Sequence, residues 1–267
     1  MQLEETIRPE TWIDRKEHPL TRESLVQLLD NRIPAIRIPG FASPEECRAF
    51  AEVAKRGNMK FYSISKRVGY IGLAQYEYRW DRPKEDYFRD AAKAEEDVQW
   101  VIERSFDPRA RLIDRLQAVY DAPVEVAREE GGRYFAGIIR STSDGIDLHA
   151  DWAPLNSPTY AIGRIDGQLG WNFFAESLLE GGYTTVHNRP WNPEVVDGEI
   201  PRSYGFGREV VAGAVPFRYE ATAGDVVLFN TRNPHEVAGG QVAPGGSRVS
   251  IGSFIGRMPD RRLVLWS

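Results

Sequence analysis

Five polar residues in the second half of the chain have the types and the order of a metal site followed by an anion site. His149 and Asp151 are separated by one residue, His235 stands alone much further along, and Arg248 and Ser250 again have one residue between them. Two imidazoles and one carboxylate can hold a ferrous ion on one side and leave its other positions open for a cosubstrate and oxygen. We therefore predict an iron site made of His149, Asp151 and His235.

The spacing of these residues has a physical reason if they lie on strands. Side chains at positions i and i+2 project from the same face of a strand, so His149 and Asp151 would point together. A Gly224-Asp225 turn opens an apolar strand, and the loop after that strand carries His235. The carboxylate would offset part of the metal charge, and the imidazoles would bind as neutral ligands.

Arg248 and Ser250 would share one face of the next strand by the same spacing rule. A guanidinium matches a carboxylate in two parallel hydrogen bonds, and a hydroxyl two residues away can add a third donor. This pair suits the far carboxylate of 2-oxoglutarate. Arg140 is a further candidate for contact with the cosubstrate, and Trp152 and Trp171 are candidates for contact with the substrate. The alternatives are a barrel salt bridge for Arg140 and plain packing for Trp152.

A purely structural interpretation of the histidines stands beside the catalytic one. His149 and His235 could be ordinary loop histidines, with Asp151 capping a turn and Arg248 paired on the exterior of a barrel. We expect His187 to lie beside the ligands or at the surface, because no carboxylate follows it two residues later. His18 is expected at the surface.

Several further motifs accompany the metal triplet: Gly181-Gly182 opening a strand, Trp191-Asn192-Pro193, the Gly224-Asp225 strand, and the ending from Ser250-Ile251-Gly252-Ser253-Phe254 through Trp266-Ser267. With these motifs the sequence from about Pro34 onward resembles the iron(II)- and 2-oxoglutarate-dependent oxygenases. It is similar to their small-molecule branch, which contains the hapalindole-type alkaloid halogenases and the N-acyl amino acid hydroxylases.

This resemblance implies a double-stranded β-helix with iron(II), 2-oxoglutarate and oxygen as the reagents. It also implies hydroxylation of an unactivated C-H bond in a small, specialised metabolite, with release of succinate and carbon dioxide. In the halogenases the carboxylate position is a glycine, which leaves a coordination site for chloride. Asp151 stands at that position here, so the resemblance implies hydroxylation or a related oxidation and argues against native halogenation.

Two other functional classes stay open at this point. A cupin-like binding or sensor protein would hold a metal in the same barrel without consuming oxygen, but it would not require Arg248 and Ser250. An isomerase or hydrolase would use His149 and Asp151 as an acid and base pair, with no dependence on iron or 2-oxoglutarate. Nothing in the sequence specifies a nucleophile or an oxyanion site for that chemistry.

The expected fold is mainly β with N-terminal helices, forming a jelly roll within a single domain over residues 1–267. The helix-rich part covers about residues 1–125, and the jelly-roll core covers about residues 126–267. Apolar periodicity and capping residues predict helices at 21–30, 43–56, 84–103 and 108–120, with a short strand at 35–38. Cys47 falls on the apolar side of the second helix, so we expect a buried side chain and not a reactive thiol.

Two segments have ambiguous patterns. Residues 57–83 are rich in aromatics and could line the substrate pocket, but alternation such as Tyr76-Glu77-Tyr78-Arg79-Trp80 is typical of a half-buried strand, and we favour the strand. The loop at 188–208 contains several prolines and glycines and is either a lid or a passive crossover.

Composition and charge exclude several other classes of protein. The 267 residues carry a net charge of −5 and are 42% hydrophobic, which suits a folded enzyme and gives no basic stripe for a nucleic-acid backbone. The single cysteine cannot form an intramolecular disulfide, and no apolar run reaches signal-peptide or membrane length. We therefore expect a cytoplasmic enzyme with a small-molecule substrate, no membrane association and an oligomeric state that the sequence does not reveal.

Overall fold

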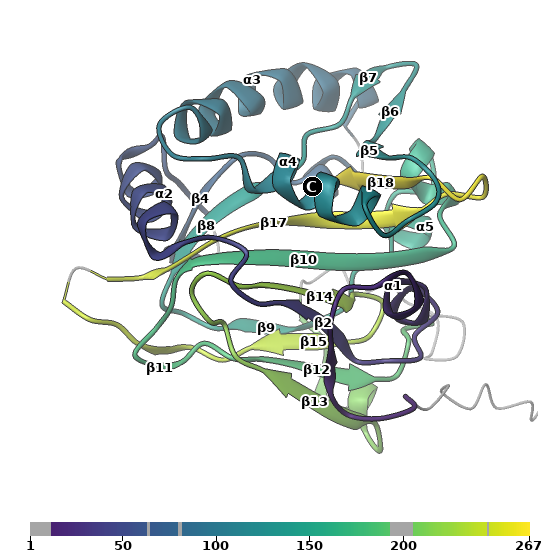
Figure 1. The fold of residues 1–267 in the computed structure, drawn as a ribbon. Coiled ribbons are helices and arrows are strands. Elements are labelled where there is room, and N and C mark those ends of the chain that lie inside the picture. Colours follow the sequence, from purple (N-terminus) through teal and green to yellow (C-terminus); the bar gives the residue numbers. More distant parts are fainter. Residues whose placement is uncertain (1–11, 63–64, 80–81, 193–204, 245) are drawn as a thin grey trace, which may run out of the picture.

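A computed structural model describes residues 12–62, 65–79, 82–192, 205–244 and 246–267. Figure 1 shows a large sheet covered on one face by helices and faced on the other by a smaller sheet. Among the described helices, none combines the length and the apolarity needed to cross a lipid bilayer.

The four predicted helices are all present near the predicted bounds. The helices are α1 (Arg22–Leu29), α2 (Pro44–Arg56), α3 (Lys84–Ile102) and α4 (Pro108–Gln117), with a short α5 (Ala153–Asn156) further on. The start of α2 follows directly from its sequence: the Ser43 hydroxyl accepts from the Glu46 amide, and the Glu46 side chain accepts from the Ser43 amide. This capping box satisfies amides that the first turn leaves without partners. Cys47 on this helix is buried, as predicted.

The large sheet has ten strands among the described residues. They are β1 (Glu17–His18), β2 (Ala35–Ile38), β3 (Lys60–Tyr62), β4 (Ser65–Ile71), β5 (Val124–Val126), β8 (Ile138–Thr142), β10 (Gly167–Glu176), β14 (Val226–Asn230), β17 (Arg248–Arg257) and β18 (Leu263–Trp266). The main order is β1-β2-β14-β10-β17-β8-β4-β3, with β18 pairing β17 and β5. Strands from the helix-rich first part are thus hydrogen-bonded into the same sheet as strands from the C-terminal part.

The smaller sheet has the order β13-β12-β15-β9. Its strands are β9 (Ile146–His149), β12 (Thr184–Asn188), β13 (Val215–Tyr219) and β15 (His235–Val237). Two short ribbons complete the described strands, one pairing β6 (Arg128–Glu129) with β7 (Gly132–Arg133) and the other pairing β11 (Glu180–Gly181) with β16 (Gly240–Gln241).

The two faces of the large sheet contribute to different cores. Trp171, Phe173 and Leu228 pack in the larger apolar cluster with helix residues such as Phe50. Phe174, Val227 and Phe229 pack instead with Val186 and Tyr219 of the smaller sheet. Successive side chains of a strand point to opposite faces, so the alternation along β10 and β14 separates the helix side from the space between the sheets.

One predicted strand is wrong. Gln75–Tyr78 form a 3-10 helix, η1, and not the half-buried strand that the aromatic alternation at 76–80 suggested. The aromatic side chains of this segment do not alternate between two faces as they would on a strand. Tyr78 packs on Tyr87 of α3, and the Arg79 guanidinium lies over the Tyr76 ring. Trp80 lies outside the described residues, as does the section 193–204 of the loop that could be a lid or a passive crossover.

Candidate metal centre

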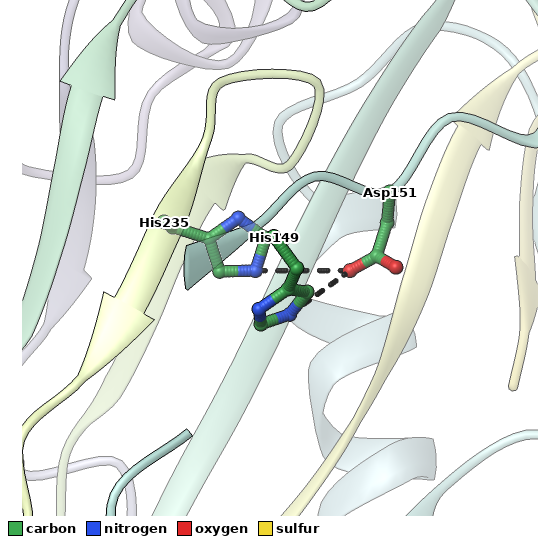
Figure 2. Close-up of side chains that lie close together, drawn as sticks. All are labelled: His149, Asp151 and His235. Atoms are coloured by element: carbon green, nitrogen blue, oxygen red, sulfur yellow. Dashed lines mark ion pairs between the residues drawn. The ribbon is translucent and has the colours of Figure 1, made fainter. Parts of the chain in front are cut away.

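His149, Asp151 and His235 converge in the structure. Each offers one ligand atom, and these atoms all lie within 4.8 Å of one another. The Nε2 atoms of His149 and His235 lie 3.6 and 3.7 Å from the same carboxylate oxygen, Oδ2 of Asp151 (Figure 2). His149 and His235 are buried and Asp151 is only partly exposed. Two imidazole nitrogens and a carboxylate oxygen in one buried place are a donor set for a divalent transition metal.

The backbone arrangement differs in detail from the sequence prediction. His149 is the last residue of β9, and Asp151 lies beyond the end of this strand, with its amide donating to the Thr231 carbonyl at 2.9 Å. His235 is the first residue of β15 and pairs with His149 across the ladder. The common direction of the ligands therefore comes from strand pairing for the two histidines and from a hydrogen-bonded loop for the aspartate.

Backbone carbonyls hold both imidazoles in one orientation. Nδ1 of His149 lies 2.6 Å from the Asp147 carbonyl, and Nδ1 of His235 lies 3.0 Å from the Asn233 carbonyl. A carbonyl only accepts hydrogen bonds, so each Nδ1 carries the proton and each Nε2 keeps its lone pair. Both lone pairs belong to the atoms that face Asp151.

The electrostatics of the cluster suit a cation. Burial lowers the pKa of His235 well below its ordinary value, and the nearby His149 lowers it further. Burial raises the pKa of the Asp151 carboxyl, while His149 and the charges of Arg140 and Arg79 act in the opposite direction. A neutral imidazole is the form that binds a metal, and a bound cation would stabilise the ionised carboxylate.

Arg248, Ser250 and Arg140 face the same space between the sheets. Ser250 is the register partner of Phe174 on one side and of Arg140 on the other. Phe174 belongs to the cluster between the sheets, and directly paired residues share a face. Arg248 lies two residues before Ser250, so it points the same way. The structure thus brings the predicted anion-binding residues to the compartment that holds the three candidate metal ligands.

Arg248 is a buried cation in the candidate site. Arg248 is only 5% exposed, and burial lowers the pKa of its guanidinium to about 10. Its NH1 group donates to the Gly182 carbonyl at 3.1 Å, but its buried Nε has no hydrogen-bond partner among the described residues. In the described ranges no carboxylate forms an ion pair with it. A buried unpaired cation is costly, so this side chain fits the far carboxylate of a dicarboxylic acid.

The other predicted residues have different outcomes. Trp152 follows Asp151 directly, is partly buried, and has the Arg232 guanidinium over its ring. Trp171 lies on the helix side of β10, where its indole donates to the Ser253 hydroxyl at 2.6 Å, so the structure does not bring it to the metal ligands. His187 bonds to Glu236 outside the cluster, and His18 is half-buried beside Asp14 instead of fully at the surface.

Residues near the site that the sequence did not single out come from two places. Arg79 and Tyr76 belong to the segment around η1, and both interact electrostatically with Asp151. Tyr219 and Phe229 lie between the sheets, and the Phe229 ring packs at 4.8 Å, centroid to centroid, on the His235 ring. The aromatic richness of residues 57–83 was a signal for the first pair. No spacing rule indicates the second pair, because its position depends on strand register and on the packing of the two sheets.

Two curated proteins are similar to this chain in sequence. No protein-family model matches the sequence. The chain is 32% identical over 211 residues, 75% of its length and 86% of the relative, to the leucinostatins biosynthesis cluster protein S of Purpureocillium lilacinum. It is 29% identical over 258 residues, 92% of its length and 93% of the relative, to the L-gamma-glutamyl-L-propargylglycine hydroxylase of Streptantibioticus cattleyicolor.

Solved structures show the fold. The N-substituted L-amino acid dioxygenase of Burkholderia ambifaria, also solved with alpha-ketoglutarate, superposes with a TM-score of 0.59 at 13% identity over 92% of this chain and 91% of that one. The chain belongs to the iron(II)- and 2-oxoglutarate-dependent oxygenases. The alpha-ketoglutarate-dependent epimerase SnoN from nogalamycin biosynthesis has the same fold, with a TM-score of 0.51 at 13% identity over 88% and 86% of the two chains. This oxygenase fold therefore occurs with more than one reaction outcome.

Proposed function

We propose that the protein is an iron(II)- and 2-oxoglutarate-dependent dioxygenase that hydroxylates a C-H bond of a small amino acid derivative, within a single domain built as a double-stranded β-helix. The observation that carries the proposal is the shared compartment of two sites. The ligand atoms of His149, Asp151 and His235 converge there, and Arg248 faces the same space with a buried nitrogen that lacks a partner among the described residues.

Each residue has a separate task in this proposal. His149, Asp151 and His235 hold the iron, and their own hydrogen bonds keep the Nε2 lone pairs aimed at it. Arg248 and Ser250 bind the far carboxylate of 2-oxoglutarate. When bound, the iron with 2-oxoglutarate and oxygen supplies the oxidative decarboxylation that yields succinate and carbon dioxide together with the oxidising equivalent for the substrate. The protein contributes position and a site largely closed to water.

Arg140 extends the anion site toward the substrate. It is the register partner of Ser250, and its charge acts on both Asp151 and Arg248. We therefore place Arg140 at the boundary between the cosubstrate and the substrate.

The charges around the metal ligands favour a substrate with a carboxylate. Three arginine charges act in this compartment. Arg79 and Arg140 act on the Asp151 carboxyl, and Arg140 also acts on the Arg248 guanidinium. Among the relatives, one is named as an N-substituted L-amino acid dioxygenase and another as an L-gamma-glutamyl-L-propargylglycine hydroxylase. An N-substituted or γ-glutamyl amino acid has the anionic group that such a site selects.

The first test is cosubstrate binding in the absence of oxygen. Iron(II) and 2-oxoglutarate are added anaerobically to the purified protein, and the weak visible metal-to-ligand charge-transfer band is recorded, with Arg248→Ala as the matched variant. We expect a band in the natural protein and a much weaker one in the variant at the same 2-oxoglutarate concentration. Iron bound without any band would favour the cupin-like metal-binding protein, and no iron binding would favour the isomerase.

A second experiment distinguishes hydroxylation from other outcomes of the same chemistry. N-acyl and γ-glutamyl amino acids are screened by succinate release, and the product of any active compound is analysed after turnover under 18O2. Hydroxylation adds one oxygen atom to the product and a mass increase that follows the label. An epimerised or cyclised product with no added oxygen would overturn the hydroxylase assignment while leaving the oxygenase family intact.

A further inference from the structure

Tyr219 is a buried tyrosine inside the compartment of the metal ligands. It ends β13, pairs with Thr184 of β12 and is 2% exposed. Its ring packs on Phe229 with centroids 5.8 Å apart, and Phe229 packs in turn on the His235 imidazole. One phenylalanine ring therefore separates this tyrosine from an iron ligand.

The hydroxyl of Tyr219 has no hydrogen-bond partner among the described residues, although the Thr184 side chain lies beside it. A buried polar group without a partner is destabilising, and such groups in native structures call for an explanation. A phenylalanine would fill the same space without that cost. The hydroxyl is therefore expected to serve something that the protein chain itself does not provide.

Arg248 has a second buried polar atom of the same kind. Its Nε is also buried without a partner in the described part of the chain. The guanidinium and the Tyr219 phenol interact electrostatically, and both side chains are buried. The bond from NH1 of Arg248 to the Gly182 carbonyl anchors the guanidinium near the start of β12, two residues before Thr184. Two unpaired donors, one of them charged, thus lie together in a buried space.

We propose that Tyr219 binds the far carboxylate of 2-oxoglutarate together with Arg248, with its hydroxyl donating to a carboxylate oxygen. This inference rests on the proposed function, because it assigns a further residue to the same cosubstrate site. A carboxylate has several acceptor positions, so it can receive the phenol and the guanidinium at once. Tyr219 is a binding residue for the cosubstrate and has no part in the chemical step. A buried water bridging Tyr219 and Arg248 is the competing explanation.

Tyr219→Phe tests the inference, because it removes the hydroxyl and keeps the ring. Dissociation constants of 2-oxoglutarate and of pyruvate are measured anaerobically on the iron(II)-loaded protein from the charge-transfer band. Pyruvate keeps the α-keto acid and lacks the far carboxylate. We expect the variant to bind 2-oxoglutarate about ten-fold more weakly, the loss typical of one hydrogen bond to a charged group, and to bind pyruvate as the natural protein does.

Two controls make the result specific. Tyr183→Phe removes a hydroxyl just before the neighbouring strand β12, where the Arg218 guanidinium lies over the Tyr183 ring, and it should leave both constants unchanged. The melting temperature of metal-free Tyr219→Phe should equal or exceed that of the natural protein, because an unpaired buried hydroxyl has been removed. Unchanged 2-oxoglutarate binding in Tyr219→Phe would overturn the inference, as would an equal weakening of both ligands. Absence of 2-oxoglutarate binding in the natural protein would instead overturn the proposed function.

Discussion

The carbonyl oxygen of Asn233 lies 3.0 Å from Nδ1 of His235 and holds this imidazole for metal binding. Asn233 is itself held by a buried network. Its side-chain amide donates to Oδ1 of Asn31 at 2.6 Å, and the Trp12 indole donates to the same oxygen at 3.2 Å. Asn31 also donates to Asn188 at 3.1 Å. The segment before β2 thus fixes the loop that presents a metal ligand.

Removal of the Asn31 side chain is expected to weaken iron binding. Asn31 has a positive φ of 55°, a conformation that glycine adopts without strain, so Asn31→Gly deletes the network at little backbone cost. We expect iron(II) affinity to fall about ten-fold or more, as is typical when groups that orient a metal-bound histidine are removed. Competition with a metal-binding dye gives the affinity. Asn58→Ala, which removes a surface asparagine bonded to Asp97, is the control, and equal affinities for all three proteins would contradict the positioning role.

Asp151→Gly should separate iron retention from folding. The substitution removes the carboxylate of the candidate ligand set, so we expect the iron content after gel filtration and the rate of succinate release to fall strongly. Burial raises the pKa of Asp151, so the metal-free protein gains from the loss of a buried carboxyl and its melting temperature should not decrease. Full iron occupancy with unchanged turnover in this variant would show that Asp151 is not a ligand.

The convergence of the three candidate ligands and the shared compartment of Arg248 could be predicted from the sequence, because each of these residues belongs to a short pattern. His149 with Asp151, and Arg248 with Ser250, are pairs at a spacing of two, and His235 follows a recognisable glycine-aspartate strand. The prediction that Asp151 continues a strand failed, because β9 ends at His149 and hydrogen bonds to Thr231 direct the aspartate instead.

The remaining site residues could not be predicted because they meet only through tertiary structure. Tyr219 enters the space between the sheets through the pairing of β13 with β12 and the packing of two sheets, and Asn31 bonds to Asn233 across 202 positions of sequence. The prediction of a strand near Tyr76, where the structure has a 3-10 helix, was wrong for a related reason. Its aromatic alternation matched a strand, but contacts of Tyr78 with α3 determine the local conformation.

Glu46 gives a pH-dependent contribution to stability. Its ion pair with Arg111, at 2.6 Å, lowers the pKa of the Glu46 carboxyl from 4.5 to about 2. A carboxyl whose pKa is lower in the folded than in the unfolded state stabilises the folded protein when the pH is above the unfolded-state pKa. For Glu46 this contribution is lost as the pH falls from about 4.5 toward 2. Glu46→Gln keeps a capping-box side chain and should cost about 1 kcal/mol at pH 7, after allowance for solvent screening.

Urea unfolding of Glu46→Gln at several pH values measures this effect. The difference from the natural protein should shrink between pH 5 and pH 3, because the natural glutamate becomes protonated on unfolding in that range. Glu45→Gln is the matched control, since Glu45 pairs with Arg48 on the exposed surface of the same helix. A difference that is constant with pH would mean that Glu46 acts through packing and not through its charge.

Arg79 is expected to select the charge of the substrate. Its guanidinium lies over the Tyr76 ring and acts on Asp151, so it is placed to receive an anionic group of the substrate. Arg79→Gln should raise the KM for an active carboxylate-bearing substrate about ten-fold and leave the dissociation constant of 2-oxoglutarate unchanged. Arg82→Gln is the control, because Arg82 stacks in the same way on Tyr78 but is more exposed. A weaker binding of 2-oxoglutarate in Arg79→Gln would place this arginine in the cosubstrate site.

Trp171 and Trp152 should respond differently to the same substitution, because Trp171 is enclosed in the core and only Trp152 adjoins Asp151 in the sequence. The Trp171 indole is fully buried against the helix side and bonded to Ser253. Trp171→Phe leaves the Ser253 hydroxyl short of a donor and shrinks a core side chain, so unfolding should become easier by about 1–3 kcal/mol, with KM and 2-oxoglutarate binding unchanged. Trp152 adjoins Asp151 and carries the Arg232 guanidinium, so Trp152→Phe should change KM more than stability. Urea unfolding gives the stability of both variants, and steady-state kinetics give their KM values. An altered KM in Trp171→Phe with normal stability would show that Trp171 contacts the substrate after all.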